Sequence, residues 1–226
     1  MNILLIAATA AEIAPFLEWC SDWEQEGDGL FVRGELRLQV LVSGVGATAT
    51  AWALGYSMAQ WRPDWVINAG IGGAIDRSLA LGQVVQVITD RFGDLGIEQA
   101  DGSFVPLEAT GLTDPDQYPW QAGKLQPPGA ESPFFPPANG ITVQKVHGYA
   151  PSIDRLRETF PEAQVESMEG AAVFYACMMA GVPVLQLRSI SNFVETRNRA
   201  NWQIREAVAA LNEALQAVIR AVLPAE

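Results

Sequence analysis

The chain has 226 residues, of which 49% are hydrophobic and 18% are charged. This composition supports a full apolar core and is not that of a disordered protein. The formal net charge is −12, with only 14 lysines and arginines. This negative charge argues against nucleic acid as a partner, because phosphate binding needs clustered cations. The two cysteines, Cys20 and Cys177, belong to no CxxC pair and are expected to be buried thiols in a reducing cytosol.

The N-terminal residues NILLIAATAA have the small-residue end of a signal peptide. No Lys or Arg precedes them and Glu12 follows, so a buried strand at 2–7 is predicted instead. The longest apolar stretch, 171–187, is interrupted by Gly181 and Pro183, which indicates a helix, a cap and a strand rather than a membrane span. We therefore expect a soluble, cytoplasmic protein that needs no membrane.

The remaining elements follow in regular alternation. A helix is expected from about Ala10 to Cys20, and a hairpin at 30–42 that turns at Gly34-Glu35. Further strands are predicted at 64–70, 82–90, 141–146 and 182–190, and further helices at 47–61, 152–159, 169–180 and 203–222. This pattern predicts a three-layer αβα fold around a central mixed, largely parallel twisted sheet.

Residues 97–140 break the alternation, with eight of the 14 prolines and little periodicity. Long loops in compact domains are usually functional or disordered. Because apolar residues recur in this segment, we expect one domain, 1–226, with a Pro-rich insertion that makes an ordered excursion near the site or at a subunit interface.

The chain contains one histidine, His147. A histidine-based zinc site is therefore out of reach, and a Ser-His-Asp triad would depend on this single residue. We expect no metal and no cofactor. The chemistry is left to carboxylates, amides, hydroxyls and backbone groups.

Glycines gather near predicted strand ends at 44–46 and 70–73. They fit neither a Walker loop nor GxGxxG, so dinucleotide binding has weak support. They have an ordinary explanation as turn or close-packing residues. Alternatively, glycines such as Gly72 let a ligand approach the backbone closely.

Three polar residues follow predicted buried strands. Glu12 has capping-box spacing to Thr9, Glu169 is an acid at a helix N-terminus, and Asn192 suits a turn. Each residue alone has this structural explanation. In a parallel sheet, however, all three could face one crevice, which is where open α/β folds bind ligands.

Five segments, AATAAE, SGVG, NAGIGG, VESMEG and RSISN, occur in an order and spacing that resemble the purine nucleoside phosphorylase and nucleosidase superfamily. The resemblance lies close to the methylthioadenosine/S-adenosylhomocysteine nucleosidases and covers nearly the whole chain except 97–140. It implies that Glu12 activates water, that Glu169 and Met168 hold the ribose, and that Asn192, supported by Ser191, stabilises the leaving purine. It also implies a homo-oligomer, often a dimer.

The loop AATAAEIAP favours water over phosphate as the nucleophile. The first arginine of the chain is Arg33, and a carboxylate near phosphate would repel it by roughly 1 kcal/mol. In the loop HGYAP, where the family places groups that stack on the base, this sequence departs from the nucleosidase pattern. Tyr149 is expected to stack there and His147 to be a hydrogen-bonding loop residue.

Adenine-releasing nucleosidases have aspartate where this chain has Asn192. A 6-oxopurine protonated at N7 presents one acceptor, O6, and one donor, N7–H, which an amide matches. Opposite adenine, the amide would leave a buried donor unpaired, at about 1–3 kcal/mol. The sequence thus favours hypoxanthine and resembles the futalosine hydrolase family, which acts in an alternative route to menaquinone.

Futalosine carries a carboxyphenyl arm, so a cation and aromatic residues are expected beside the site. Candidates are Phe193, Arg197, Arg199 and Trp202, although a solvated charged loop would explain the arginines equally well. Two other functions stay open: a methylthioadenosine/S-adenosylhomocysteine nucleosidase, and a non-catalytic nucleoside-binding protein. Replacing Glu12 with Gln separates a catalyst from a binder, because only a catalyst has turnover to lose.

Overall fold

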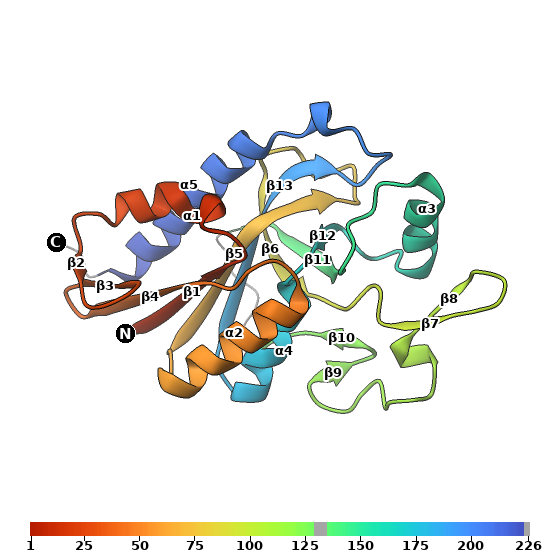
Figure 1. Cartoon of the computed structure of the whole chain (residues 1–226), viewed down its shortest axis with the longest axis horizontal. Helices are drawn as coiled ribbons and strands as arrows, with labels where there is room; N and C mark the ends of the chain where they lie inside the picture. The colour runs from red at the N-terminus through yellow and green to blue at the C-terminus, as the bar shows by residue number, and fades with distance from the viewer. Residues whose placement is uncertain (129–134, 224–226) are drawn as a thin grey trace.

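A central sheet organises the computed structural model, which describes residues 1–128 and 135–223 (Figure 1). Within the described residues nine strands form this sheet in the order β12-β11-β6-β13-β5-β1-β4-β3-β2. β12 also pairs with β5, so one end of the sheet closes on itself. The strands are β1 (Asn2–Ala7), β2 (Glu24–Gln25), β3 (Leu30–Arg33), β4 (Leu36–Val42), β5 (Trp65–Ala74), β6 (Val84–Thr89), β11 (Pro137–Thr142), β12 (Val165–Ser167) and β13 (Val184–Phe193).

The central strands β4, β1, β5 and β13 are parallel to one another, whereas β6 is antiparallel to β13 and the β3–β4 pair is an antiparallel hairpin. The expected mixed, largely parallel sheet is therefore confirmed. Parallel strands bring their carboxyl ends to one edge, where an open α/β sheet binds its ligands.

Helices cover both faces of the sheet, as Figure 1 shows. Helices α1 (Ala10–Trp19) and α5 (Ile204–Val222) pack together on one face, and α2 (Ala47–Gln60) and α4 (Gly170–Ala180) on the other. Side chains of β1 alternate between them: Ile3 and Leu5 join the α1–α5 core, while Leu4 and Ile6 join the α2–α4 core. The predicted three-layer arrangement is confirmed. Helix α3 (Ala150–Thr159) packs beside the closed end of the sheet.

Three strand predictions were displaced: the strand expected at 182–190 is β13, which continues to Phe193 and contains Asn192, and the other two are displaced at glycines. The strand expected at 64–70 continues to Ala74, and the strand expected at 141–146 lies at 137–142. Close packing explains the difference: a Cβ on Gly72 would lie 2.9 Å from Val165 of β12, and one on Gly140 would lie 2.8 Å from Asp90. Both glycines are strand residues that a neighbouring side chain approaches closely, so close packing is the explanation that holds for Gly72.

The Pro-rich segment between β6 and β11 forms elements of its own. They are the hairpin of β7 (Gly96–Glu98) and β8 (Phe104–Pro106), the 3-10 helix η1 (Leu107–Ala109), and the hairpin of β9 (Trp120–Gln121) and β10 (Lys124–Leu125). Residues 129–134 of the predicted insertion lie outside the described residues. No helix in the described part of the chain combines the length and apolarity needed to cross a bilayer.

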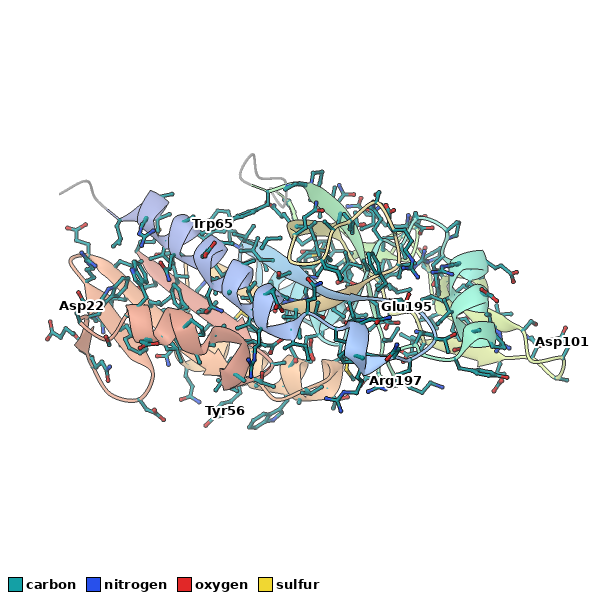
Figure 2. All side chains as sticks on the ribbon, turned by 90° about the horizontal axis from the view of Figure 1, so that it is seen from above. Asp22, Tyr56, Trp65, Asp101, Glu195 and Arg197 are labelled. Carbon is teal, nitrogen blue, oxygen red and sulfur yellow. The ribbon has the colours of Figure 1, made fainter. Side chains whose placement is uncertain are left out.

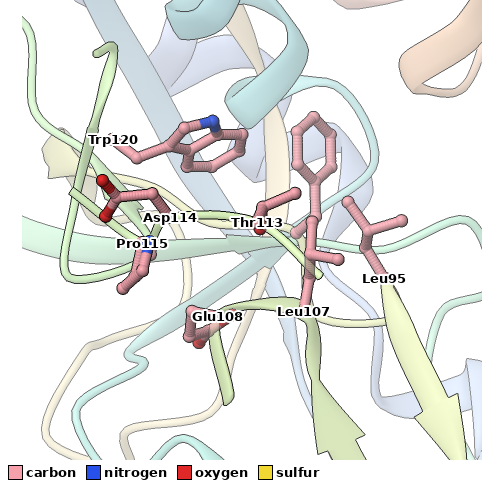
Figure 3. Close-up of a pocket in the computed structure, with 9 residues that line it drawn as sticks. Leu95, Leu107, Glu108, Thr113, Asp114, Pro115 and Trp120 are labelled. Atoms are coloured by element: carbon pink, nitrogen blue, oxygen red, sulfur yellow. The ribbon is translucent and has the colours of Figure 1, made fainter. Parts of the chain in front are cut away.

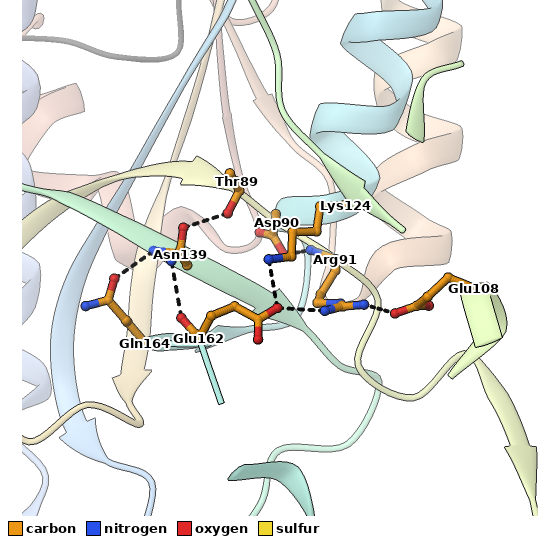
Figure 4. Close-up of polar contacts among 8 residues, drawn as sticks. All are labelled: Thr89, Asp90, Arg91, Glu108, Lys124, Asn139, Glu162 and Gln164. Atoms are coloured by element: carbon orange, nitrogen blue, oxygen red, sulfur yellow. Dashed lines mark hydrogen bonds and ion pairs between the residues drawn. The ribbon is translucent and has the colours of Figure 1, made fainter. Parts of the chain in front are cut away.

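Ion pairs fasten this segment to the sheet (Figure 4). Arg91 pairs with Glu108 of η1 and with Glu162 before β12, and Lys124 of β10 pairs with Glu162 at 2.9 Å. Leu125 bonds the backbone of Asp90 in both directions. The excursion is thus held against the core beside the closed end of the sheet.

Candidate active site

A cleft of about 730 Å³ opens where β1, β5 and β13 end and where α4 and α5 begin. The structure brings most of the sequence-predicted residues to its wall. They are Glu12, Gly72, Met168, Glu169, Ser191, Asn192, Arg197 and Trp202. Figure 2 shows Arg197 near Glu195 on the loop that follows β13.

Glu12 occupies the first turn of α1, with both carboxylate oxygens held. The backbone N–H and the hydroxyl of Thr9 donate to Oε2 at 3.0 and 2.9 Å, and the N–H of Ile71 donates to Oε1 at 3.1 Å. The same carboxylate therefore belongs to the capping contacts and to the cleft wall. The capping role and the role in the cleft, both considered for Glu12 from the sequence, are therefore compatible.

Glu169 is the N-cap residue of α4, and its Oε1 accepts the N–H of Gly46 at 3.0 Å. Burial raises the pKa of this carboxyl above its usual value, and the nearby Glu12 charge raises it further. The Arg188 charge and the Gly46 N–H act in the opposite direction. Two carboxylates within electrostatic range of one another in a cleft are typical of a functional site.

Arg188 is a site residue that the sequence prediction missed. Its side chain is 1% exposed, and Nη1 donates to Asn68 Oδ1 at 3.3 Å and to the Leu187 carbonyl at 3.1 Å. Nε and Nη2 have no hydrogen-bond partner among the described residues. A Cβ placed on Gly70 would lie 3.1 Å from Glu12 Oε1 and 3.2 Å from Arg188 Nη1, so guanidinium and carboxylate lie over the same glycine.

A signal for Arg188 existed in the sequence. An arginine inside an apolar strand is rare, because a charge is buried only where a partner or ligand meets it. The segment LQLRSIS contains such an arginine three residues before Ser191.

Asn192 presents an oriented amide to the cleft. Ser191 Oγ lies 2.8 Å from Asn192 Oδ1, and Asn192 Nδ2 donates to the Phe193 carbonyl at 3.0 Å. This network assigns the amide orientation. It leaves one N–H of Nδ2 and one lone pair of Oδ1 unused, so the amide still offers one donor and one acceptor.

Three predicted residues lie elsewhere. Tyr149 is 70% exposed at the N-cap of α3 and does not line the cleft. Phe193 follows Asn192 in β13, so its side chain faces the other way and lies 4.4 Å from the Arg77 guanidinium carbon. Arg199 belongs to the 3-10 helix η2 (Arg199–Asn201) and does not line the cleft.

Other residues line the wall in their place. The loop HGYAP contributes His147, next to Val146, and α5 contributes Arg205 close to its first residue. Glu166 of β12 is a further carboxylate that the sequence prediction missed. Its signal was weak, because a Glu inside a three-residue strand before Glu169 reads as a surface residue.

A second hollow lies in the Pro-rich excursion (Figure 3). It has a volume of about 20 Å³, room for one water at most, with walls that include Leu107 and Trp120. It is too small for a nucleoside. Within residues 1–128 and 135–223, no three His, Cys, Asp or Glu side chains are grouped to hold a metal ion.

Comparisons with known proteins give a consistent picture. A family model described as "Phosphorylase superfamily" matches residues 2–224. The chain is 39% identical to a futalosine hydrolase of Streptomyces coelicolor over 78% of its own length and 76% of the relative. It is 34% identical to a futalosine hydrolase of Acidothermus cellulolyticus over 95% and 89%.

Solved structures show the same fold. A 5'-methylthioadenosine/S-adenosylhomocysteine nucleosidase from Neisseria meningitidis in complex with methylthio-immucillin-A superposes with a TM-score of 0.80. The match covers 98% of this chain and 99% of that one, at 18% identity.

Proposed function

Because the chain belongs to the phosphorylase superfamily, we propose that it hydrolyses the N-glycosidic bond of futalosine and releases hypoxanthine. Two relatives named futalosine hydrolase, 39% and 34% identical to it, support this proposal. The site residues and their roles below are part of the proposal.

The oriented amide of Asn192 is the observation that carries the choice of base. A departing hypoxanthine protonated at N7 has a donor at N7 and an acceptor at O6. The unused lone pair of Oδ1 accepts the first, and the unused N–H of Nδ2 donates to the second. Adenine would place its N6 amino group against that N–H, which leaves a buried donor unpaired at about 1–3 kcal/mol.

The loop after β1, which lines the cleft, favours water as the nucleophile. The loop after β1 lines the cleft with Ala8, Thr9, Ala11 and Glu12, without a cation to bind phosphate. The carboxylate of Glu12 accepts a proton from water as the glycosidic bond breaks, and the departing base takes up one proton at N7 from solvent, so that one water is added across the bond.

Glu169 and Met168 hold the ribose. Carboxylate oxygens accept from the vicinal hydroxyls, and Oε1 of Glu169 is already fixed by the Gly46 N–H at 3.0 Å. Bonds to the hydroxyls strengthen as positive charge develops on the sugar, which stabilises an oxocarbenium-like transition state.

The carboxyphenyl arm is assigned to the channel between α1 and α5. Its walls are largely apolar, with Ala11, Pro15, Ile204, Val208 and Ala209, and Arg205 lies among them. Arg197 and Trp202 stand nearby, with the Arg197 guanidinium carbon 5.1 Å from the indole ring centre. An aromatic carboxylate has the matching chemistry, an apolar ring that ends in an anion.

A homo-oligomer is also proposed. Trp52 and Tyr56 on α2 are 71% and 60% exposed and stack on one another with ring centres 5.4 Å apart; Tyr56 is labelled in Figure 2. Exposed aromatic pairs are typical of protein interfaces. Sedimentation of the purified protein measures the number of subunits.

The test is an incubation without phosphate. Purified protein is mixed separately with futalosine, inosine, methylthioadenosine and S-adenosylhomocysteine, and the released base is separated by chromatography. Hypoxanthine from futalosine, with little from inosine and no adenine, is the expected result. Adenine release from methylthioadenosine would contradict the assignment of Asn192 and would favour the nucleosidase alternative.

A further inference from the structure

A third carboxylate, Glu166, faces the cleft and has no role in the proposed hydrolysis. Glu166 is 4% exposed and lines the cleft together with His147. The backbone N–H of His147 donates to Glu166 Oε1 at 3.0 Å, and the ring Nδ1 of His147 makes a close contact with Oε2. Both oxygens are thus held by one residue, and each keeps a further lone pair.

The register of the sheet places this carboxylate opposite Asn192. Glu166 of β12 and Asn192 of β13 both align with Gly73 of β5, one strand on either side of it. Side chains at the same register point to the same face, and two strand spacings put the two Cα atoms about 10 Å apart. Gly73 has no side chain between them; a Cβ there would lie 3.2 Å from Asn192 Nδ2. A flat base over Gly73 therefore meets Asn192 on one edge and Glu166 on another.

We propose that Glu166, oriented by His147, accepts the N1–H of the 6-oxopurine and is a second determinant of base specificity. This inference rests on the proposed function, in which Asn192 takes O6 and N7. N1 is the ring atom next to the carbon that carries O6. It bears a proton in hypoxanthine and a bare lone pair in adenine. A carboxylate therefore binds the first and repels the second.

His147 is a positioning residue in this arrangement. Its ring also lines a neighbouring hollow of about 350 Å³, which Lys145 and Arg155 line as well. The imidazole therefore stands between the two hollows. A replacement by a small side chain would join them, whereas phenylalanine keeps a ring in the wall and removes the Nδ1 contact.

Calorimetric binding of three free bases tests the proposal: hypoxanthine, 1-methylhypoxanthine and adenine. Wild-type protein is expected to bind hypoxanthine about 10- to 100-fold more tightly than 1-methylhypoxanthine, which has no N1–H. In Glu166→Gln, one amide N–H faces the base, so this ratio falls below about 3 and adenine gains affinity relative to hypoxanthine. In His147→Phe the ratio falls at least about 3-fold, because one contact that orients the carboxylate is lost.

Glu158→Gln is the matched control, because it makes the same change from carboxylate to amide at an exposed position of α3. It is expected to keep the wild-type ratio of affinities for hypoxanthine and 1-methylhypoxanthine. Equal affinity of the wild type for hypoxanthine and 1-methylhypoxanthine overturns the proposal without any variant. An unchanged ratio in a Glu166→Gln protein with a wild-type melting temperature overturns it too. Futalosine turnover by the same wild-type sample separates the two levels: turnover with equal base affinities rejects only the role of Glu166, and absence of turnover rejects the function itself.

Discussion

Two polar clusters in this molecule use their charges differently. Around Arg91, the charged side chains form ion pairs with one another. Arg91 pairs with Glu108 and Glu162, and Lys124 also pairs with Glu162 (Figure 4). In the cleft, the carboxylates of Glu12 and Glu169 are held by backbone N–H groups. Beside Glu12, two nitrogens of Arg188 have no hydrogen-bond partner within residues 1–128 and 135–223. The first cluster fastens the excursion, whereas the second keeps hydrogen-bonding capacity for a ligand.

Glu12→Gln gives the largest expected effect, because it removes the proposed base from the second cluster. We expect kcat for futalosine to fall about 10³-fold with the melting temperature nearly unchanged, since general base catalysis contributes 10²–10⁴-fold. Steady-state kinetics with chromatographic detection of hypoxanthine measures it. A variant that keeps more than a tenth of wild-type kcat would remove Glu12 from the mechanism.

Asp90 lies beside the Arg91 cluster, and we expect it to make the unfolding free energy depend on pH. It is buried and accepts bonds from Arg91, Thr142 and Gln186, yet burial raises its pKa from 3.8 to about 6. The folded state thus keeps a proton that the unfolded state loses near pH 4, so this contribution to stability is lost as the pH rises from about 4 to 6. At 1.36 kcal/mol per unit, the loss is about 3 kcal/mol.

Urea unfolding of wild type and Asp90→Asn between pH 4 and 7 checks this slope. The difference in unfolding free energy between the two proteins isolates Asp90, because carboxyls whose pKa is lowered, such as Asp76, contribute equally to both. A difference that does not change with pH would show that Asp90 titrates at its ordinary pKa.

Glu108→Gln is expected to have the opposite effect to Glu12→Gln, with a loss of stability and unchanged turnover. It removes a charge paired with Arg91, whose side chain is 10% exposed, while Glu162 still binds the same guanidinium. We expect a loss of about 2 kcal/mol of unfolding free energy and unchanged futalosine turnover. Comparable losses of turnover in Glu108→Gln and Glu12→Gln, with both proteins folded, would mean that the two clusters are not functionally distinct.

The sequence predicted the layers well, because β1, α2 and α5 each contain a strong local pattern. It failed where a residue's neighbour is distant in the chain. The predicted strand at 64–70 stopped short of Gly72 and the one at 141–146 began after Gly140, but both glycines are strand positions that Val165 and Asp90 approach closely.

The site shows the same limit. Glu12, Glu169 and Asn192 were predicted because each follows a predicted strand, whereas Arg188 and Glu166 lie inside strands, although RSISN and VESMEG contain them. Glu166 lines the cleft through the pairing of β12 with β5, and Arg188 lies beside Glu12 at Gly70. Tyr149 was chosen for its aromatic ring, but the direction of the chain into α3 turns it outward. Periodicity does not encode such directions.

The most direct test of the account is the base preference of Asn192→Asp, measured as kcat/KM for futalosine and for its 6-amino analogue. A carboxylate accepts both donors of N7-protonated adenine but repels O6 of hypoxanthine. We expect the ratio in favour of futalosine to fall about 10- to 100-fold, corresponding to about 1–3 kcal/mol. Ser191→Ala, which frees the amide to turn, should lower the ratio less. An unchanged ratio in Asn192→Asp would contradict the assignment of the base edge to this residue.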